Sequence, residues 1–195
     1  MGGVRSMTIS MDDLKANQAA QEGLFWAFDF RVEAHPNQWG GFSVDGYDRL
    51  ELIGQDGSGG QFLLLPGGHW VLYISSEGAA GIIAADLDAF LALIVACPYW
   101  RDLLRYSGDG KLDEMRRAAP VLESVTLEEE DGIEDARDAI KSELGIADPA
   151  DPVGALHAAV STSQIAVRAQ DGTPYASLFG TFTIEDNPKL RDRAD

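Results

Sequence analysis

Short hydrophobic runs separated by glycine-rich turns organise the middle of the chain. The runs span residues 49–54, 61–65 and 70–75, and the two connections between them contain Asp-Gly and Gly-Gly pairs. Such pairs supply the positive φ angles that tight hairpin connections require. The pattern therefore predicts an antiparallel three-stranded meander, to which a short strand at 81–84 is expected to add. Because residues 62–65 are all apolar, both faces of the middle strand are expected to be covered.

A helical period replaces this pattern after the meander. Apolar residues fall at i, i+3, i+4, i+7 and i+8 from Leu87 to Val95, which predicts a helix over 86–97 packed across the sheet. Further helices are expected over 11–21, 99–106, 111–119, 121–129, 133–144 and 152–160. The aromatic run at 24–32 is interpreted as an extended segment, and 165–169 with 175–179 as a terminal hairpin.

The predicted fold class is α+β. We expect an antiparallel β-meander sheet with helices packed on one face, plus C-terminal helices and a short β-hairpin. A chain of 195 residues is long enough for one well-packed core, so a single domain over 1–195 is expected. Residues 1–10 and 187–195 are expected to be flexible, and 107–195 to form a C-terminal extension without an assigned role.

The charge balance narrows the choice of partners. The chain carries 32 Asp and Glu against 15 Lys and Arg, a formal net charge of −17. Such a surface repels nucleic-acid phosphates and anionic lipid heads, and it attracts basic proteins. Acidity that serves solubility alone is the open alternative. The absence of an apolar stretch of membrane-spanning length and the lone Cys97, expected to be buried, favour a cytoplasmic protein.

The sequence contains no recognisable motif for catalysis or metal binding. His35, His69 and His157 are far apart in sequence and form no ligand pair, so no metal site is expected. The glycine-rich loop at 54–60 matches neither a phosphate-binding loop nor a calcium loop, and Ser58 lacks the spacing of a hydrolase nucleophile. We therefore expect no catalytic residues and no cofactor.

Three blocks of the chain resemble the SUKH superfamily. They are Leu-Ile-Gly-Gln-Asp-Gly-Ser-Gly-Gly-Gln-Phe at 52–62, Val-Leu-Tyr-Ile-Ser-Ser-Glu-Gly at 71–78, and Ile-Ala-Ala-Asp-Leu-Asp-Ala-Phe-Leu at 83–91. The blocks are similar to that family's glycine turn, a following strand and the start of a helix, in the same order. The chain departs from the family in lacking its N-terminal Leu-Pro motif, and residues beyond about 106 exceed its usual core.

The resemblance implies a non-enzymatic, cofactor-free domain that binds another protein, as in bacterial immunity proteins that neutralise polymorphic toxins. A basic toxin, such as a nuclease, would suit the acidic charge. The candidate contacts, which flank strand ends and turns of the meander, are Asp45, Asp48, Asp56 and Glu77. The run Glu128 to Asp131 is a second candidate patch, with a solvated helix end as its alternative.

Two other functions stay open at this point. One is a regulatory protein-interaction module outside any toxin system, and the other is a small enzyme whose site carries no known motif. A pocket with converging, perturbed titratable groups would favour the enzyme. For stability, we expect Gly57 or Gly59 to take a positive φ, and Asp56→Ala to matter less than valine at either glycine.

Overall fold

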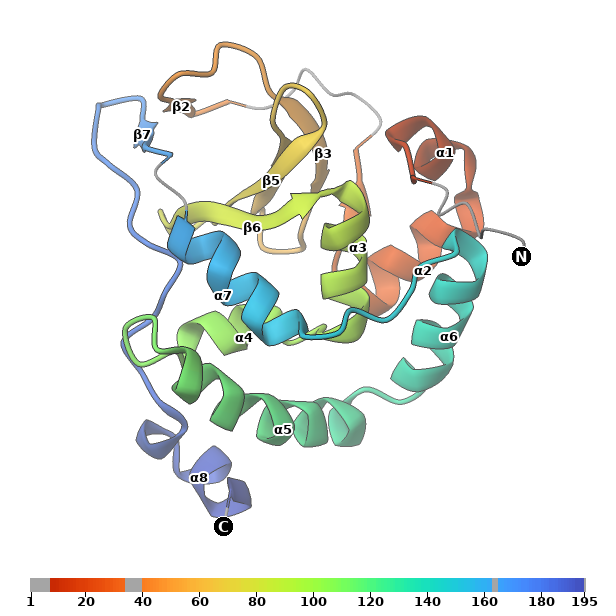
Figure 1. Cartoon of the computed structure of the whole chain (residues 1–195), viewed down its shortest axis with the longest axis vertical. Coiled ribbons are helices and arrows are strands. Elements are labelled where there is room, and N and C mark those ends of the chain that lie inside the picture. The colour runs from red at the N-terminus through yellow and green to blue at the C-terminus, as the bar shows by residue number, and fades with distance from the viewer. Residues whose placement is uncertain (1–7, 34–39, 163–164, 195) are drawn as a thin grey trace, which may run out of the picture.

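The computed structural model describes residues 8–33, 40–162 and 165–194 and has the predicted α+β architecture. Its main sheet is antiparallel, in the order β1-β3-β4-β5-β6 (Figure 1). The strands are β1 (Arg31–Val32), β3 (Glu51–Gln55), β4 (Gln61–Leu64), β5 (His69–Ile74) and β6 (Ala80–Asp86). The meander predicted from the glycine turns is therefore confirmed, with β4 between β3 and β5. Within the described residues, no helix has the length and apolar character needed to cross a membrane.

An apolar cluster covers each face of the sheet. Alternate residues of a strand point to opposite faces, so neighbouring residues belong to different clusters. On β4, Phe62 belongs to a core shared with the helices, whereas Leu63 belongs to a second cluster on the other face. That second face is covered by a two-stranded sheet of β2 (Phe42–Val44) and β7 (Val167–Ala169). The expectation that both faces of the middle strand are covered is confirmed.

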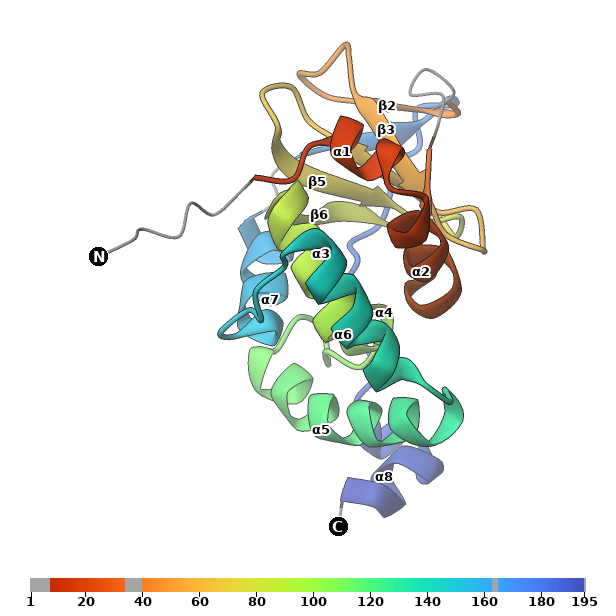
Figure 2. The ribbon, with the colours of Figure 1, turned by 90° about the vertical axis from the view of Figure 1, so that its right-hand side faces the viewer.

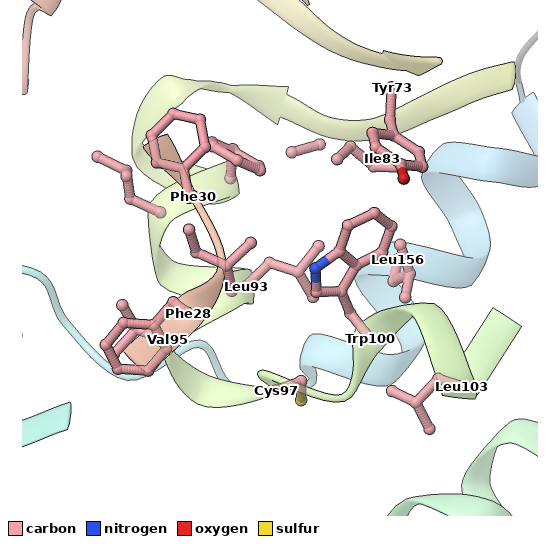
Figure 3. Close-up of a cluster of buried hydrophobic side chains, with 14 of the residues drawn as sticks. Phe28, Phe30, Tyr73, Ile83, Leu93, Val95, Cys97, Trp100, Leu103 and Leu156 are labelled. Atoms are coloured by element: carbon pink, nitrogen blue, oxygen red, sulfur yellow. The ribbon is translucent and has the colours of Figure 1, made fainter. Parts of the chain in front are cut away.

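Helices cover the first face of the sheet (Figure 2). The predicted helix after the meander is α3 (Leu87–Ala96), capped by Asp86, and α4 (Trp100–Arg105) follows it. Trp100 is the largest fully buried side chain and lies edge-on to Tyr73, with ring centroids 5.0 Å apart (Figure 3). The ring of Phe62 contacts both, so strands and helices share one aromatic core.

The N-terminal region corrects one prediction. The capping box of Ser10 is present and starts α1 (Met11–Ala16), but a second helix, α2 (Gln18–Phe28), occupies most of the segment interpreted as extended. Leu24 and Phe28 lie one helical turn apart and are both buried. The helix therefore places these apolar side chains of residues 24–28 on one buried face, whereas a strand would direct neighbouring residues to opposite faces. Only Arg31–Val32 is a strand.

A second correction concerns Pro120, which does not separate two helices. It lies inside a single helix, α5 (Leu112–Glu129). Met115, Ala118 and Leu122 are buried on one face on both sides of the proline. Burial of this continuous apolar stripe outweighs the backbone hydrogen bond that the proline removes. The helices α6 (Ile133–Leu144) and α7 (Pro152–Thr162) follow as predicted, and both contribute to the same core as the sheet.

The C-terminal region differs from the predicted hairpin. The chain turns after β7, where the Ala169 N–H donates to the Thr173 carbonyl (2.8 Å) and the Tyr175 N–H to the Val167 carbonyl (2.9 Å). The main ladder of β7 is nevertheless with β2, and the predicted strand at 175–179 does not form. A short 3-10 turn (Ile184–Asp186) precedes the tail 187–195, and within that tail the structure has α8 (Pro188–Ala194), where Leu190 is buried. Of the first ten residues, 1–7 lie outside the described part and Ser10 is fixed as a helix cap.

Candidate functional site

The glycine turn between β3 and β4 is built around a buried carboxylate, Asp56. One carboxylate oxygen accepts hydrogen bonds from the backbone N–H groups of Ser58 (2.9 Å) and Gly60 (2.8 Å) and from the Ser58 hydroxyl (2.7 Å). The other oxygen accepts from the Tyr73 hydroxyl (2.7 Å) and from the Arg101 guanidinium (3.0 Å). These donors satisfy both oxygens, so the turn is a closed polar network beneath the sheet end.

The network fixes the charge state of its members. Burial favours the neutral form of Asp56, but the hydrogen bonds from Tyr73 and Ser58, the Arg101 charge and the Gly60 N–H outweigh burial and hold the pKa of this carboxyl below its usual range. Burial, together with the neighbouring Asp56, raises the pKa of Tyr73, which stays a neutral donor. Arg101 also pairs with Asp29 at 3.4 Å and thereby connects the turn to α2.

The structure changes two expectations about this turn. The Asp56 side chain has no exposed surface, so it cannot be the solvent-facing partner contact that the sequence suggested. Asp56 is also the acceptor at the centre of the turn, so its removal is expected to matter more for stability than the sequence suggested. The positive φ expected at one of two glycines is found at Gly59 (+91°). The motif that resembles the SUKH glycine turn therefore has a clear structural role.

The remaining predicted contacts do not form one cluster. Glu77 lies in the turn between β5 and β6, at the same sheet end as Asp56, and is exposed. Asp45 and Asp48 precede β3 and lie toward its opposite end, where both are exposed. Asp45 is 3.7 Å from Arg168 of β7. The four candidate residues thus divide between two ends of the meander.

A hollow of about 710 Å³ opens beside the glycine turn, and we call it the sheet-end pocket. It lies between the turns of the meander, α4 and the segment 177–182. Among its lining residues are Ser58, Tyr73, Glu77, Arg101, Asp102, Arg105 and Phe182. Phe182 is 51% exposed, and the Arg105 guanidinium lies 5.9 Å from the centre of its ring. The pocket therefore combines charges of both signs with an accessible aromatic ring.

Asp102 joins the sheet-end pocket to a second hollow. It lines both, and its partial burial raises the pKa of its carboxyl against the opposing charges of Arg105 and Arg101. The second hollow, of about 300 Å³, lies between the end of α2, α4 and the end of α5. We call it the Trp26 hollow, after the exposed tryptophan that lines it.

The Trp26 hollow has an acidic and aromatic lining. Trp26 is 80% exposed, although Phe25 contacts its ring edge-on with centroids 4.8 Å apart. The charged residues that line the hollow are all carboxylates, namely Asp29, Asp102, Glu129 and Glu130. In the described part of the chain, Glu129 and Glu130 have no cation within ion-pair distance. A large exposed ring beside unpaired carboxylates is suited to binding a cation.

The second candidate patch of the sequence, Glu128 to Asp131, is thus divided by the fold. Glu128 is held by two hydrogen bonds of 2.8 Å from Arg193 of α8, which also lower the pKa of its carboxyl. Glu129 and Glu130 face the Trp26 hollow instead. Sequence reasoning missed Trp26 because it interpreted 24–32 as extended. In a helix, a residue midway between the buried Leu24 and Phe28 lies on the opposite, exposed side.

Cys97 and His157 are not placed as a nucleophile or a free base. Cys97 is buried, and this burial raises the pKa of its thiol to about 11, so the thiolate nucleophile is scarce at neutral pH. His157 hydrogen-bonds the Gly110 carbonyl at 2.9 Å, and His35 lies outside the described residues. Over the residues that the structure describes, no three His, Cys, Asp or Glu side chains are grouped to hold a metal ion.

Comparisons with known proteins identify no family or relative of this chain. No protein-family model matches the chain, and no significant match was found among curated proteins or among solved structures.

Proposed function

We propose that this protein is a non-enzymatic binding domain that recognises a basic protein partner through the surface around α4. The observation that carries the proposal is the Trp26 hollow, where an 80% exposed tryptophan lies among carboxylates. Tryptophan is enriched at the energetic centres of protein interfaces, and its ring attracts Lys and Arg side chains. The net charge of −17 would speed the encounter with such a partner.

The surface extends from the Trp26 hollow to the sheet-end pocket, because Asp102 lines both. Glu77 and Phe182 lie on the second part. The surface thus has two accessible aromatic rings, carboxylates around Trp26 and charges of both signs around Phe182. In such a pattern, apolar anchors supply affinity and charges steer association. Asp45 and Asp48 lie outside this surface and are retained only as secondary candidates.

The partner that we propose is a bacterial toxin, which makes the chain an immunity protein. The support is the resemblance of residues 52–62, 71–78 and 83–91 to the SUKH superfamily, together with the acidic charge. A nuclease toxin presents a basic groove to the phosphates of its substrate. Carboxylates of an inhibitor can occupy such a groove in place of phosphates.

The test begins with a partner captured from the native host or encoded beside the gene. Association and dissociation rates are then measured between roughly 50 and 500 mM salt. We expect association to slow steeply with salt and dissociation to change much less, because salt screens long-range attraction more than short contacts. The double variant Glu129→Lys/Glu130→Lys is expected to lower the association rate about tenfold at low salt.

A matched control separates local charge from total charge. Asp12→Lys/Asp138→Lys changes the net charge by the same amount at two exposed positions away from the surface around α4. The control is expected to associate at close to the wild-type rate. If both double variants slow association equally, only the total charge matters and the Trp26 hollow is not the site. Growth rescue of toxin-expressing cells distinguishes an immunity protein from a regulatory module with another partner.

An enzyme is the second candidate function, and the sheet-end pocket is the observation that favours it. Asp102, with a pKa raised by burial, lies there near Arg101 and Arg105, an arrangement from which a general acid could act. Asp102→Asn tests this idea, since the amide keeps the shape and cannot transfer the proton. If Asp102→Asn still blocks the activity of the partner completely, catalysis by Asp102 is not needed. If the variant binds the partner without blocking its activity, the result supports a catalytic role of Asp102.

A further inference from the structure

A strained tryptophan lies on a different part of the surface, at the start of β5. Trp70 has a φ of 68°, a left-handed backbone conformation that is unfavourable for a bulky aromatic residue. Its carbonyl oxygen accepts the Leu65 N–H at 3.1 Å and closes the turn between β4 and β5. The side chain nevertheless remains 40% exposed, so burial of the ring does not account for the strained position. Strain of this kind is concentrated at functional sites.

The ring of Trp70 borders an apolar groove between α3 and α7. Both helices lie against β6 (Figure 1), and Ile83 and Ala84 of β6 line the groove. Its volume is about 280 Å³, and small side chains form most of its walls. They include Ala84, Ala89, Ala92, Ala155 and Ala158. Because these side chains are small, the groove has room for one large side chain of a partner.

Two carboxylates lie at the start of α3, next to residues that line the groove. Asp86 follows Ala85 of the lining, and Asp88 lines a neighbouring hollow that shares Ala89 and Ala92 with the groove. Asp86 caps the helix through the Ala89 N–H at 2.8 Å, and Asp88 accepts the N–H of Ile9 at 2.8 Å. Neither carboxylate has a cation within ion-pair distance in the part of the chain that the structure describes. None of the residues that line the groove is charged. The two carboxylates therefore favour a basic occupant around an apolar centre.

We propose that this groove, which we call the Trp70 groove, binds one aromatic or large aliphatic side chain of a basic protein segment, stacked against Trp70. The occupant shares only its basic character with the partner proposed for the surface around α4, and the two sites lie on separate parts of the molecule. A second copy of this chain is a poor occupant, because each copy carries a net charge of −17. The volume is also below the range of most cofactor pockets and suits a single side chain.

The test uses defined peptides and alanine-methyl NMR on the full chain, because the alanines in the groove walls report the site directly. The first probe is acetyl-Lys-Lys-Phe-Lys-Lys-amide. The comparison peptides replace Phe by Ala, or all four Lys by Glu. We expect the Phe peptide to shift the methyl signals of Ala89, Ala92, Ala155 and Ala158. The Ala peptide is expected to bind about tenfold more weakly, since it lacks a buried ring, and the Glu peptide more weakly still.

Variants of the groove separate binding from folding. Ala155→Leu/Ala158→Leu fills the groove from two exposed positions and is expected to abolish the shifts at Ala89 and Ala92. Ala139→Leu, on the exposed face of α6, is the matched control and should bind as the wild type does. All three substitutions add the same atoms to helix surfaces, so a general effect on folding would appear in the control as well.

Trp70 itself gives a second, independent measurement. Trp70→Gly and Trp70→Ala both remove the ring and should weaken the Phe peptide equally. Only glycine relieves the positive φ, so Trp70→Gly is expected to melt at a higher temperature than Trp70→Ala. Loss of binding without a matching loss of stability would show that the strained ring serves recognition.

Several outcomes would overturn the inference. They are an absence of shifts with every peptide, shifts confined to other alanines, equal binding of the Phe and Ala peptides, or equal binding of the Lys and Glu peptides. Sedimentation provides a further check. If the wild type is a dimer and Ala155→Leu/Ala158→Leu is a monomer, the occupant of the groove is a second copy of this chain and not a basic segment. A negative result for the Trp70 groove does not affect the test of the surface around α4, because that test uses different variants.

Discussion

Removal of the Asp56 carboxylate is the sharpest test of how the meander is held together. The side chain has no exposed surface and accepts five hydrogen bonds from four residues. In Asp56→Ala, the Gly60 N–H and the Tyr73 hydroxyl lose their partner in a buried place, where each orphaned donor costs about 1–3 kcal/mol. Arg101 can turn to water and to Asp29, so its loss is smaller. We expect destabilisation by about 3–5 kcal/mol.

The measurement is urea unfolding followed by tryptophan fluorescence, with thermal melting in parallel. For a chain of this size, the expected loss corresponds to a fall in Tm of roughly 6–20 °C. Asp56→Asn keeps an acceptor for the Ser58 and Gly60 N–H groups and turns its amide toward Arg101. It should therefore destabilise by an intermediate amount. Asp45→Ala, which removes an exposed carboxylate, is the control and should change stability by less than about 0.5 kcal/mol.

Acidification supplies an independent check of the same network. The folded state lowers the pKa of Asp56, so its contribution is complete above the unfolded pKa of about 3.9 and is lost as the pH falls through the lower folded pKa. The stability difference between wild type and Asp56→Ala should narrow below roughly pH 4. Equal stability of Asp56→Ala and Asp45→Ala at neutral pH would refute the reasoning, since the buried carboxylate would then be dispensable.

Three further predictions address other parts of the fold. Gly59→Val should destabilise by about 1–2 kcal/mol in chemical denaturation, because Gly59 has a φ of +91°, whereas Gly57→Val meets only the Asp29 side chain and should cost less. Arg137→Ala should lower the free energy of unfolding by about 3 kcal/mol, because Arg137 is 12% exposed and binds Glu123 with both terminal nitrogens; Arg137→Lys is expected to recover only part. Cys97 should react with a thiol reagent at pH 8 only after unfolding, because burial raises its pKa to about 11, and rapid labelling of the native protein would contradict that view.

The sequence by itself determined the local architecture. The meander followed from glycine turns between short apolar runs, and the helix after it followed from one uninterrupted apolar stripe. These features depend on residues close together in the chain, namely on the positive φ that a turn needs and on the period at which side chains reach one face. The caps at Ser10 and Asp86 belong to the same class, because a side chain bonds a backbone N–H three residues away.

Tertiary contacts decided the rest, including most of the candidate site. The run at 24–28 became helix because α2 could bury Leu24 and Phe28 in the core, and this placed Trp26 on the surface. Asp56 is buried because Arg101, 45 residues later, and Tyr73 meet it. Glu128 is bound by Arg193 of α8 while Glu129 and Glu130 are left beside Trp26. Exposure and pairing depend on partners distant in sequence, which local sequence patterns do not contain and which folding brings together as it buries apolar surface.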